Sequence, residues 1–260
     1  MSYAWLVLAG LLLPQQPPPI DTGLVRSIEL ESRPGTWVQH FRLDREGARA
    51  DELPLALLSY VAGPDPTGGV HAELELDYLA QGVRVIHVEQ ASPSLRRLVF
   101  RELHERSGRT LFLEGTPETG FQGYELGGRE VVRHDQPERG EFPLLLIESA
   151  RLGMSTPEHL AVLDPLAAAF EPLELASTSA DGVRHFEARR ADGSLRWRVS
   201  LRGERIEEWR SQERGPAARP ISPEEFERLR EQNELMVRAA REAAAQAKTE
   251  AVRRPRLRRL

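Results

Sequence analysis

The sequence contains no cysteine. Disulfide bonds, thiolate catalysis, cysteine-ligated metals and a lipid-modified cysteine are therefore all excluded. The sequence also has no uninterrupted apolar run near the ~20 residues that a membrane-spanning helix needs. Glycine and proline are in contrast frequent, at 20 and 19 of 260 residues, which excludes a purely helical protein and predicts many turns.

Sequence motifs of the common enzyme classes are also missing. No G-x-S-x-G, H-E-x-x-H, P-loop or G-x-G-x-x-G pattern occurs. The seven histidines show no metal-ligand spacing. The pairs His104-Glu105 and His134-Asp135 are neighbours in the chain, but adjacent strand residues face opposite ways. We therefore predict no catalytic residue, no metal site, no cofactor and no enzymatic activity. An exported hydrolase with a site assembled from distant positions is kept as an alternative.

Charge is unevenly distributed along the chain. The formal net charge is −5, whereas residues 221–260 hold ten Lys or Arg and seven Glu, a net of +3. Residues 1–20 are uncharged, so residues 21–220 have a net charge of −8. Such an acidic body repels a phosphate backbone, and we expect no nucleic-acid partner for it.

The N-terminus has the character of an export signal. Residues 3–13 form an apolar run that ends in "PQQPPP". This length suits the h-region of a secretory signal, although no basic residue precedes it and no A-x-A site follows it. We predict an exported protein, periplasmic or envelope-associated, with a signal-like segment and Pro/Gln linker over 1–20. A β domain follows over 21–220, and a C-terminal helix with an Arg-rich tail over 221–260.

The first half of the body is predicted to be an antiparallel meander. Its segments alternate polar and apolar residues and are separated by turns such as "RPG" and "SG". The expected strands are 24–32, 36–44, 72–79, 83–90, 96–106 and 109–115.

Two short helices are predicted in the middle of the chain. Residues 142–152 begin with a proline in the first turn and stop before Gly153. Residues 157–169 follow Thr156 as a plausible N-cap, and Pro165 limits this second helix to about two turns.

Strands are expected again over 170–178, 183–190, 194–201 and 204–212. The Asp-Gly pairs at 181–182 and 192–193, with Arg202-Gly203, predict three successive hairpins. The segment "GSLRWRVSL" places Trp197 between two arginines, which raises the question of a nucleic-acid surface. Alternation puts Trp197 on one face and Arg196 and Arg198 on the other, so we interpret the segment as a half-buried strand.

The C-terminal segment is predicted to be one long helix from Ser222 to about Val252. Ser222, Pro223 and Glu225 form a capping-box pattern. The docking stripe is expected at Phe226, Leu229, Asn233, Met236 and Ala240, and the helix should project beyond Val237. The end "RRPRLRRL" can contact an anionic membrane surface through its basic side chains. These are Arg253, Arg254, Arg256, Arg258 and Arg259.

The order of these parts resembles the lipoprotein-carrier superfamily of bacterial envelopes (LolA/LolB-like) and related half-barrel proteins. The passages that resemble it are "EFPLLLIESARLG", "AVLDPLAAAFEPLEL" and "DGVRHFEARRADGSLRWRVSLRGERIEEW". The resemblance implies a mainly β, α+β fold in which a curved antiparallel sheet, an incomplete barrel, covers two short helices. In that superfamily the concave face can hold acyl chains.

We therefore expect a non-enzymatic exported protein that binds a lipid or a lipidated partner, such as a lipoprotein, in the concave face. An interaction module that docks to a membrane or a protein through the C-terminal helix is the alternative. Six apolar side chains are the expected lining of the lipid site: Trp37, Phe41, Leu146, Phe186, Trp197 and Trp209.

Overall fold

The computed structural model describes residues 34–45, 47–49, 52–65, 68–92, 97–127, 130–136, 140–211 and 217–253. The signal-like segment, the strand expected at 24–32 and the arginines at 254, 256, 258 and 259 lie outside these residues.

A single sheet of 15 strands forms the body, in the order β8-β7-β6-β5-β4-β3-β2-β1-β15-β14-β13-β12-β11-β10-β9. All neighbours pair antiparallel except β9 and β10, which are parallel. The mainly β fold with an open antiparallel sheet is as expected. The strands are β1 (Trp37–Leu43), β2 (Ala56–Pro64), β3 (Val70–Tyr78), β4 (Val83–Ala91), β5 (Leu98–His104), β6 (Arg109–Thr116), β7 (Gly120–Gly127), β8 (Glu130–Gln136), β9 (Gly140–Glu141), β10 (His159–Asp164), β11 (Ala169–Ala180), β12 (Val183–Arg189), β13 (Leu195–Arg202), β14 (Arg205–Ser211) and β15 (Ala218–Ile221).

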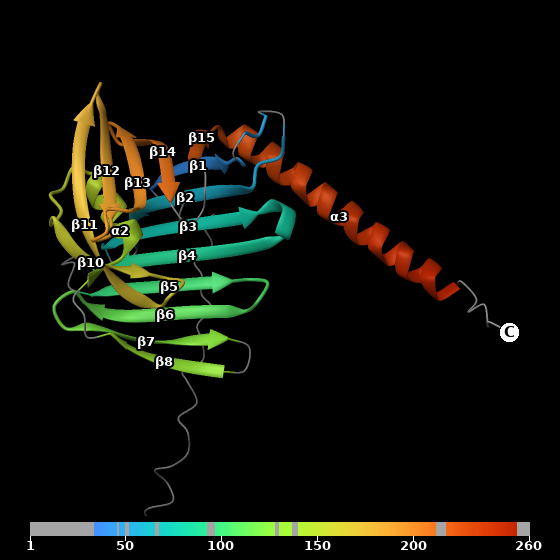
Figure 1. Cartoon of the computed structure of the whole chain (residues 1–260), viewed down its shortest axis with the longest axis horizontal. Helices are drawn as coiled ribbons and strands as arrows, with labels where there is room; N and C mark the ends of the chain where they lie inside the picture. The colour runs from blue at the N-terminus through green and yellow to red at the C-terminus, as the bar shows by residue number, and fades with distance from the viewer. Residues whose placement is uncertain are drawn as a thin grey trace, which may run out of the picture.

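Two parts of the sheet run in different directions, and helix α2 (Pro143–Arg151) lies between them (Figure 1). The strands β2–β8 form one part and β10–β14 the other. Alternate residues of both parts, including Leu74, Phe186 and Val199, face inward and form one core with α2 and with Phe41 of β1. An apolar sheet face has to be covered by another element, and here a helix covers it from inside the curve.

The first part of helix α2 is apolar on all sides, as expected of a helix at the centre of a fold. Leu144, Leu145, Leu146 and Ile147 are all buried. Burial of each such side chain stabilises the fold by ~1.5–3 kcal/mol. The helix predicted over 142–152 is therefore confirmed.

The N-terminus of α2 is capped by a strand residue. Phe142 at the N-cap position makes no side-chain cap. The backbone N–H of Leu145 instead donates to Oε2 of Glu89 on β4 at 2.8 Å, and Glu89 is fully buried. A carboxylate at this position also interacts favourably with the helix dipole.

The second predicted helix, over 157–169, is wrong. Residues 159–164 form strand β10, which pairs with β11 in the register Leu160↔Leu173 to Asp164↔Ala169. The connecting turn is closed by a hydrogen bond from the Leu166 N–H to Asp164 Oδ1 at 3.0 Å, and Ala168 adopts a left-handed φ of 50°. Pairing with β11 in a hairpin outweighs the local helix propensity of the alanines.

The predicted hairpins of the second meander are confirmed by the pairs β11·β12, β12·β13 and β13·β14. Asp181 and Gly182 both have positive φ, as a tight hairpin turn requires. The pairing register shifts between Ala188 and Arg189, opposite Arg196. This bulge turns Arg196 to the inner side with Trp197, so the prediction that the two face opposite ways is wrong for Arg196. Arg198 does face outward and pairs with Glu187.

Helix α3 (Pro223–Arg253) begins with the predicted cap, since the N–H of Glu225 donates to Oγ of Ser222 at 3.2 Å. Phe226 and Leu229 pack on Leu57 and Leu79. The helix then extends away from the body (Figure 1), and the expected stripe residue Met236 is 54% exposed. The docking stripe therefore ends earlier than predicted.

We expect Glu89→Ala to destabilise the protein by about 3 kcal/mol, because it removes a fully buried cap and leaves the Leu145 N–H and His87 without their acceptor. Urea unfolding measures this. Glu114→Ala is the matched control, because Glu114 pairs with Arg97 at the surface and such pairs contribute ~0–1 kcal/mol. Equal losses in both variants would contradict the role of Glu89.

Candidate functional site

A cavity of about 290 Å³ lies between the N-terminal half of α2 and the inner faces of both parts of the sheet. Most of its wall is apolar. The sheet contributes apolar side chains of β1–β4, β10, β11 and β13–β15, and α2 contributes Pro143, Leu144 and Ile147. The apolar strand residues at the wall are Leu43, Leu58, Leu74, Leu76, Val83, Val85, Val162, Leu163, Leu173, Trp197, Trp209 and Ala218.

Charged side chains occupy one part of the cavity wall. Glu102 and His104 of β5 meet His87 of β4 there, with Glu171 and Arg196 contributed by β11 and β13. His87 and Glu102 are direct cross-strand partners in the β4–β5 register, which places both side chains on the inner face. The cavity thus joins an apolar chamber to a polar end.

Glu102 is the centre of this polar end. Its Oε1 accepts hydrogen bonds from Nε2 of His104 at 2.8 Å and from Nη1 of Arg109 at 3.1 Å. Burial acts to raise the pKa of Glu102, but the hydrogen bond from His104 and the positive charges nearby outweigh it, so the pKa lies below its ordinary value. Glu102 is therefore ionised at neutral pH although it is only 4% exposed.

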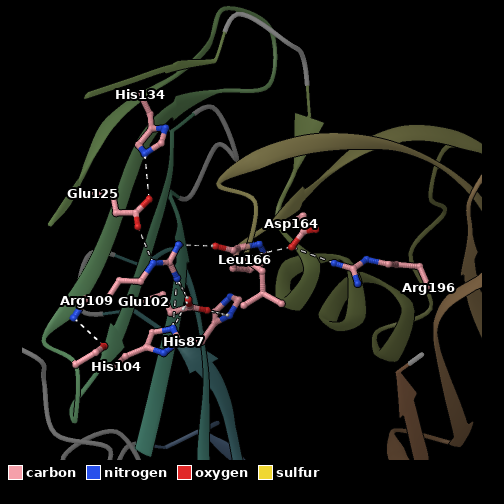
Figure 2. A network of polar contacts seen from close by, with 11 residues as sticks. His87, Glu102, His104, Arg109, Glu125, His134, Asp164, Leu166 and Arg196 are labelled. Carbon is pink, nitrogen blue, oxygen red and sulfur yellow. Dashed lines mark hydrogen bonds and ion pairs between the residues drawn. The ribbon is translucent and has the colours of Figure 1, made fainter. Parts of the chain in front are cut away.

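The polar network continues from this cluster in both directions (Figure 2). Arg109 of β6 donates to Glu125 of β7 at 2.7 Å, and Glu125 lies 3.4 Å from His134 of β8. Arg109 also donates to the Pro165 carbonyl at 3.1 Å. One guanidinium thereby ties the β10–β11 turn to the strands on the other side of the cavity.

A second arginine holds the same turn from the opposite side. Arg196 lies 3.1 Å from Asp164 and also pairs with Glu171. Leu166, at the tip of the turn, lines the cavity and is 64% exposed. The turn is therefore placed at the cavity entrance by two arginines, each shared between carboxylates.

The six apolar residues predicted to line a site all belong to one region of the core. Trp197 and Trp209 line the cavity. Phe41, Leu146 and Phe186 lie in the packed core around it, and Trp37 packs against that core from its edge. Their binding role stays a prediction. Of the five predicted tail arginines, only the backbone of Arg253 is described, as the last residue of α3.

The charged end of the cavity was not predicted. A signal for it exists, because His87 and Glu89 follow Val83 and Val85 on the same alternating face, which places polar residues on an apolar strand face. The other contributors belong to separate strands, and single residues of this kind have no recognisable spacing. Among the described residues, no group of three or more His, Asp or Glu side chains has metal-binding geometry. None of the helices described is long and apolar enough to span a membrane.

Comparisons with known proteins give a likeness at the level of structure. No family model and no curated protein matches the sequence. The solved structure of a β-barrel-like protein of domain of unknown function DUF1849 from Brucella abortus is similar, with a TM-score of 0.43 and 12% identity. The likeness covers 72% of this chain and 95% of the other. It includes no link to the lipoprotein carriers.

Next to the site, Glu141 precedes α2 and responds to pH. Burial, with the negative charges of Glu89 and Glu118, raises its pKa to about 7. The neutral carboxyl is favoured in the fold, so the stability that Glu141 contributes is complete below its unfolded pKa of about 4.5 and is lost as pH rises through about 7.

We therefore expect Glu141→Gln to raise the thermal midpoint at about pH 8 and to leave it nearly unchanged at about pH 4, where the carboxyl is neutral in both states. Differential scanning calorimetry at the two pH values checks this, with Glu114→Gln as the exposed control. A gain that is the same at both pH values would contradict the raised pKa.

Proposed function

We propose that this protein is a non-catalytic binding protein for a single-chain amphipathic molecule. The apolar chain of the ligand occupies the cavity between α2 and the sheet, and the polar group of the ligand lies at the Glu102 end. The observation that supports this most directly is the division of one cavity into an apolar chamber and a charged end.

The apolar wall of the cavity supports a ligand. Water that fills this space lies against apolar side chains, and an apolar chain that displaces it gains ~0.8 kcal/mol for each buried CH₂ group.

The cavity size favours one chain over two. Small-molecule sites usually enclose ~300–1,000 Å³, and this cavity lies at the low end of that range. Its ligand is therefore a single-chain lipid or one acyl chain of a lipidated partner, and not a two-chain phospholipid. The resemblance to lipoprotein carriers and the predicted export signal belong to the same proposal of an envelope protein that carries such a chain.

Filling the cavity should abolish binding. Ala218 is buried and lines the cavity from β15. We expect Ala218→Phe to weaken the binding of decanol at least tenfold, because the ring occupies space needed by the chain. Isothermal titration calorimetry measures the affinity, and circular dichroism verifies the fold.

The matched control is Ala239→Phe on the exposed part of α3, where the same side-chain change has no access to the cavity. Decanol should bind this variant as it binds the unmodified protein. Failure of decanol and of other decyl-chain ligands to bind the unmodified protein would refute the proposal.

A second candidate function, docking to a membrane or a protein, rests on α3. Leu235 and Met236 are 63% and 54% exposed on the projecting part of this helix. Deletion of residues 245–260 should abolish sedimentation with anionic vesicles and leave decanol binding unchanged. Unchanged sedimentation after the deletion would exclude a membrane role for this segment.

A further inference from the structure

We infer that the polar group of the ligand is a hydrogen-bond donor, an amine in its protonated form or a hydroxyl, and not a carboxylate or phosphate. This inference rests on the proposed binding function and adds the chemical class of the ligand. It is drawn from the arrangement of acceptor atoms and charges at the polar end of the cavity.

Two acceptor atoms face each other at this end. Nε2 of His87 is 2.5 Å from Oε1 of Glu89, and with an ionised Glu89, which can only accept, the proton of this contact lies on Nε2. In the neutral imidazole, Nδ1 is then an acceptor. It lies 3.7 Å from Oε2 of Glu102, which is longer than a hydrogen bond.

His87 and Glu102 both line the cavity, so these two acceptors meet the ligand. An ammonium group has several N–H donors and can donate to Nδ1 of His87 and Oε2 of Glu102 together. A hydroxyl group can donate to one of them. A carboxylate has only acceptor atoms and would add a third acceptor to the pair.

The charge balance around the cavity also favours a ligand with a protonated amine. The network contains five carboxylates, Glu89, Glu102, Glu125, Asp164 and Glu171. Its guanidiniums are Arg109, Arg190 and Arg196. The three guanidiniums balance three of the five carboxylates, so the charge of the other two is left to the histidines of the network and to the ligand.

The two arginines beside the cavity each pair with two carboxylates already. Arg196 is the arginine that lines the wall among the described residues, and it already contacts Asp164 and Glu171. Arg109 contacts Glu102 and Glu125 in the same way. An anionic ligand would have to compete with carboxylates that are fixed in the fold, whereas a cationic ligand relieves their repulsion.

Three ligands with one decyl chain test the inference: decylamine, decan-1-ol and decanoate. Their affinities are measured by isothermal titration calorimetry at about pH 8, where the amine is protonated and the acid is ionised. We expect decylamine to bind at least tenfold more tightly than decanoate, with decanol between them. Decanoate binding as tightly as decylamine would overturn the inference and leave the proposed function intact. Binding of none of the three would refute both.

The Glu102→Gln variant tests whether Glu102 causes the preference for decylamine over decanoate. Glu102→Gln keeps the size of the side chain and removes its charge, so the ratio of decylamine to decanoate affinity should fall at least fivefold. Glu187→Gln is the matched control, because Glu187 pairs with Arg189 and Arg198 on the outer side of β12 and does not line the cavity. It should leave the ratio unchanged.

Should Glu102→Gln fail to fold, Glu171→Gln serves the same purpose from β11. Glu171 lines the cavity and is less deeply buried than Glu102. Its neutralisation should lower the amine preference in the same direction. An unchanged affinity ratio in every folded cavity variant would overturn the assignment.

Discussion

The fold depends on keeping one short helix inside a curved sheet. Helix α2 has nine residues, too few for an isolated helix to be stable in water. Its position is fixed at both ends by charged side chains of the sheet. Glu89 caps the N-terminus, and Arg184 donates to the Ala150 carbonyl near the C-terminus. The buried pair of Glu148 and Arg151, with the Tyr60 hydroxyl on Glu148, orients the last turn. The apolar sides of the helix then cover the strand residues that would otherwise face water.

The two parts of the sheet are joined across the open side by side chains. A cluster of four phenylalanines connects β5 and β7 with α2 and β11: Phe100, Phe121, Phe142 and Phe170. Gly140 belongs to this contact, because a Cβ atom there would lie 2.3 Å from the Phe170 ring. Arg109 adds a polar connection to the Pro165 carbonyl. The cavity lies beside these contacts. Its wall includes Leu144 and Ile147 of α2 and Leu166 of the β10–β11 turn.

Local signals in the sequence were sufficient for much of this structure. The Asp181-Gly182 turn and the alternation around Trp197 specify hairpins within a few residues, and the proline of α2 marks its first turn. The strand β10 could not be read in this way, because its pairing with β11 outweighs the helix propensity of residues 157–169. The inward position of Arg196 depends on a bulge that has no sequence signal. The site is likewise only partly predictable. The inward position of Trp197 and Trp209 follows from alternation, whereas the contact between His87 and Glu102 depends on the β4–β5 register.

The proposed function requires an apolar chain in the cavity between α2 and the sheet. Isotope-filtered NMR of the protein with methyl-labelled leucine and unlabelled decanol measures this contact directly. We predict nuclear Overhauser effects from the decyl chain to the methyl groups of Leu74 and Leu76, which line the cavity, and none to the exposed Leu235. Contacts to Leu235 without contacts to the cavity leucines would place the ligand on the protein surface and refute binding in the cavity.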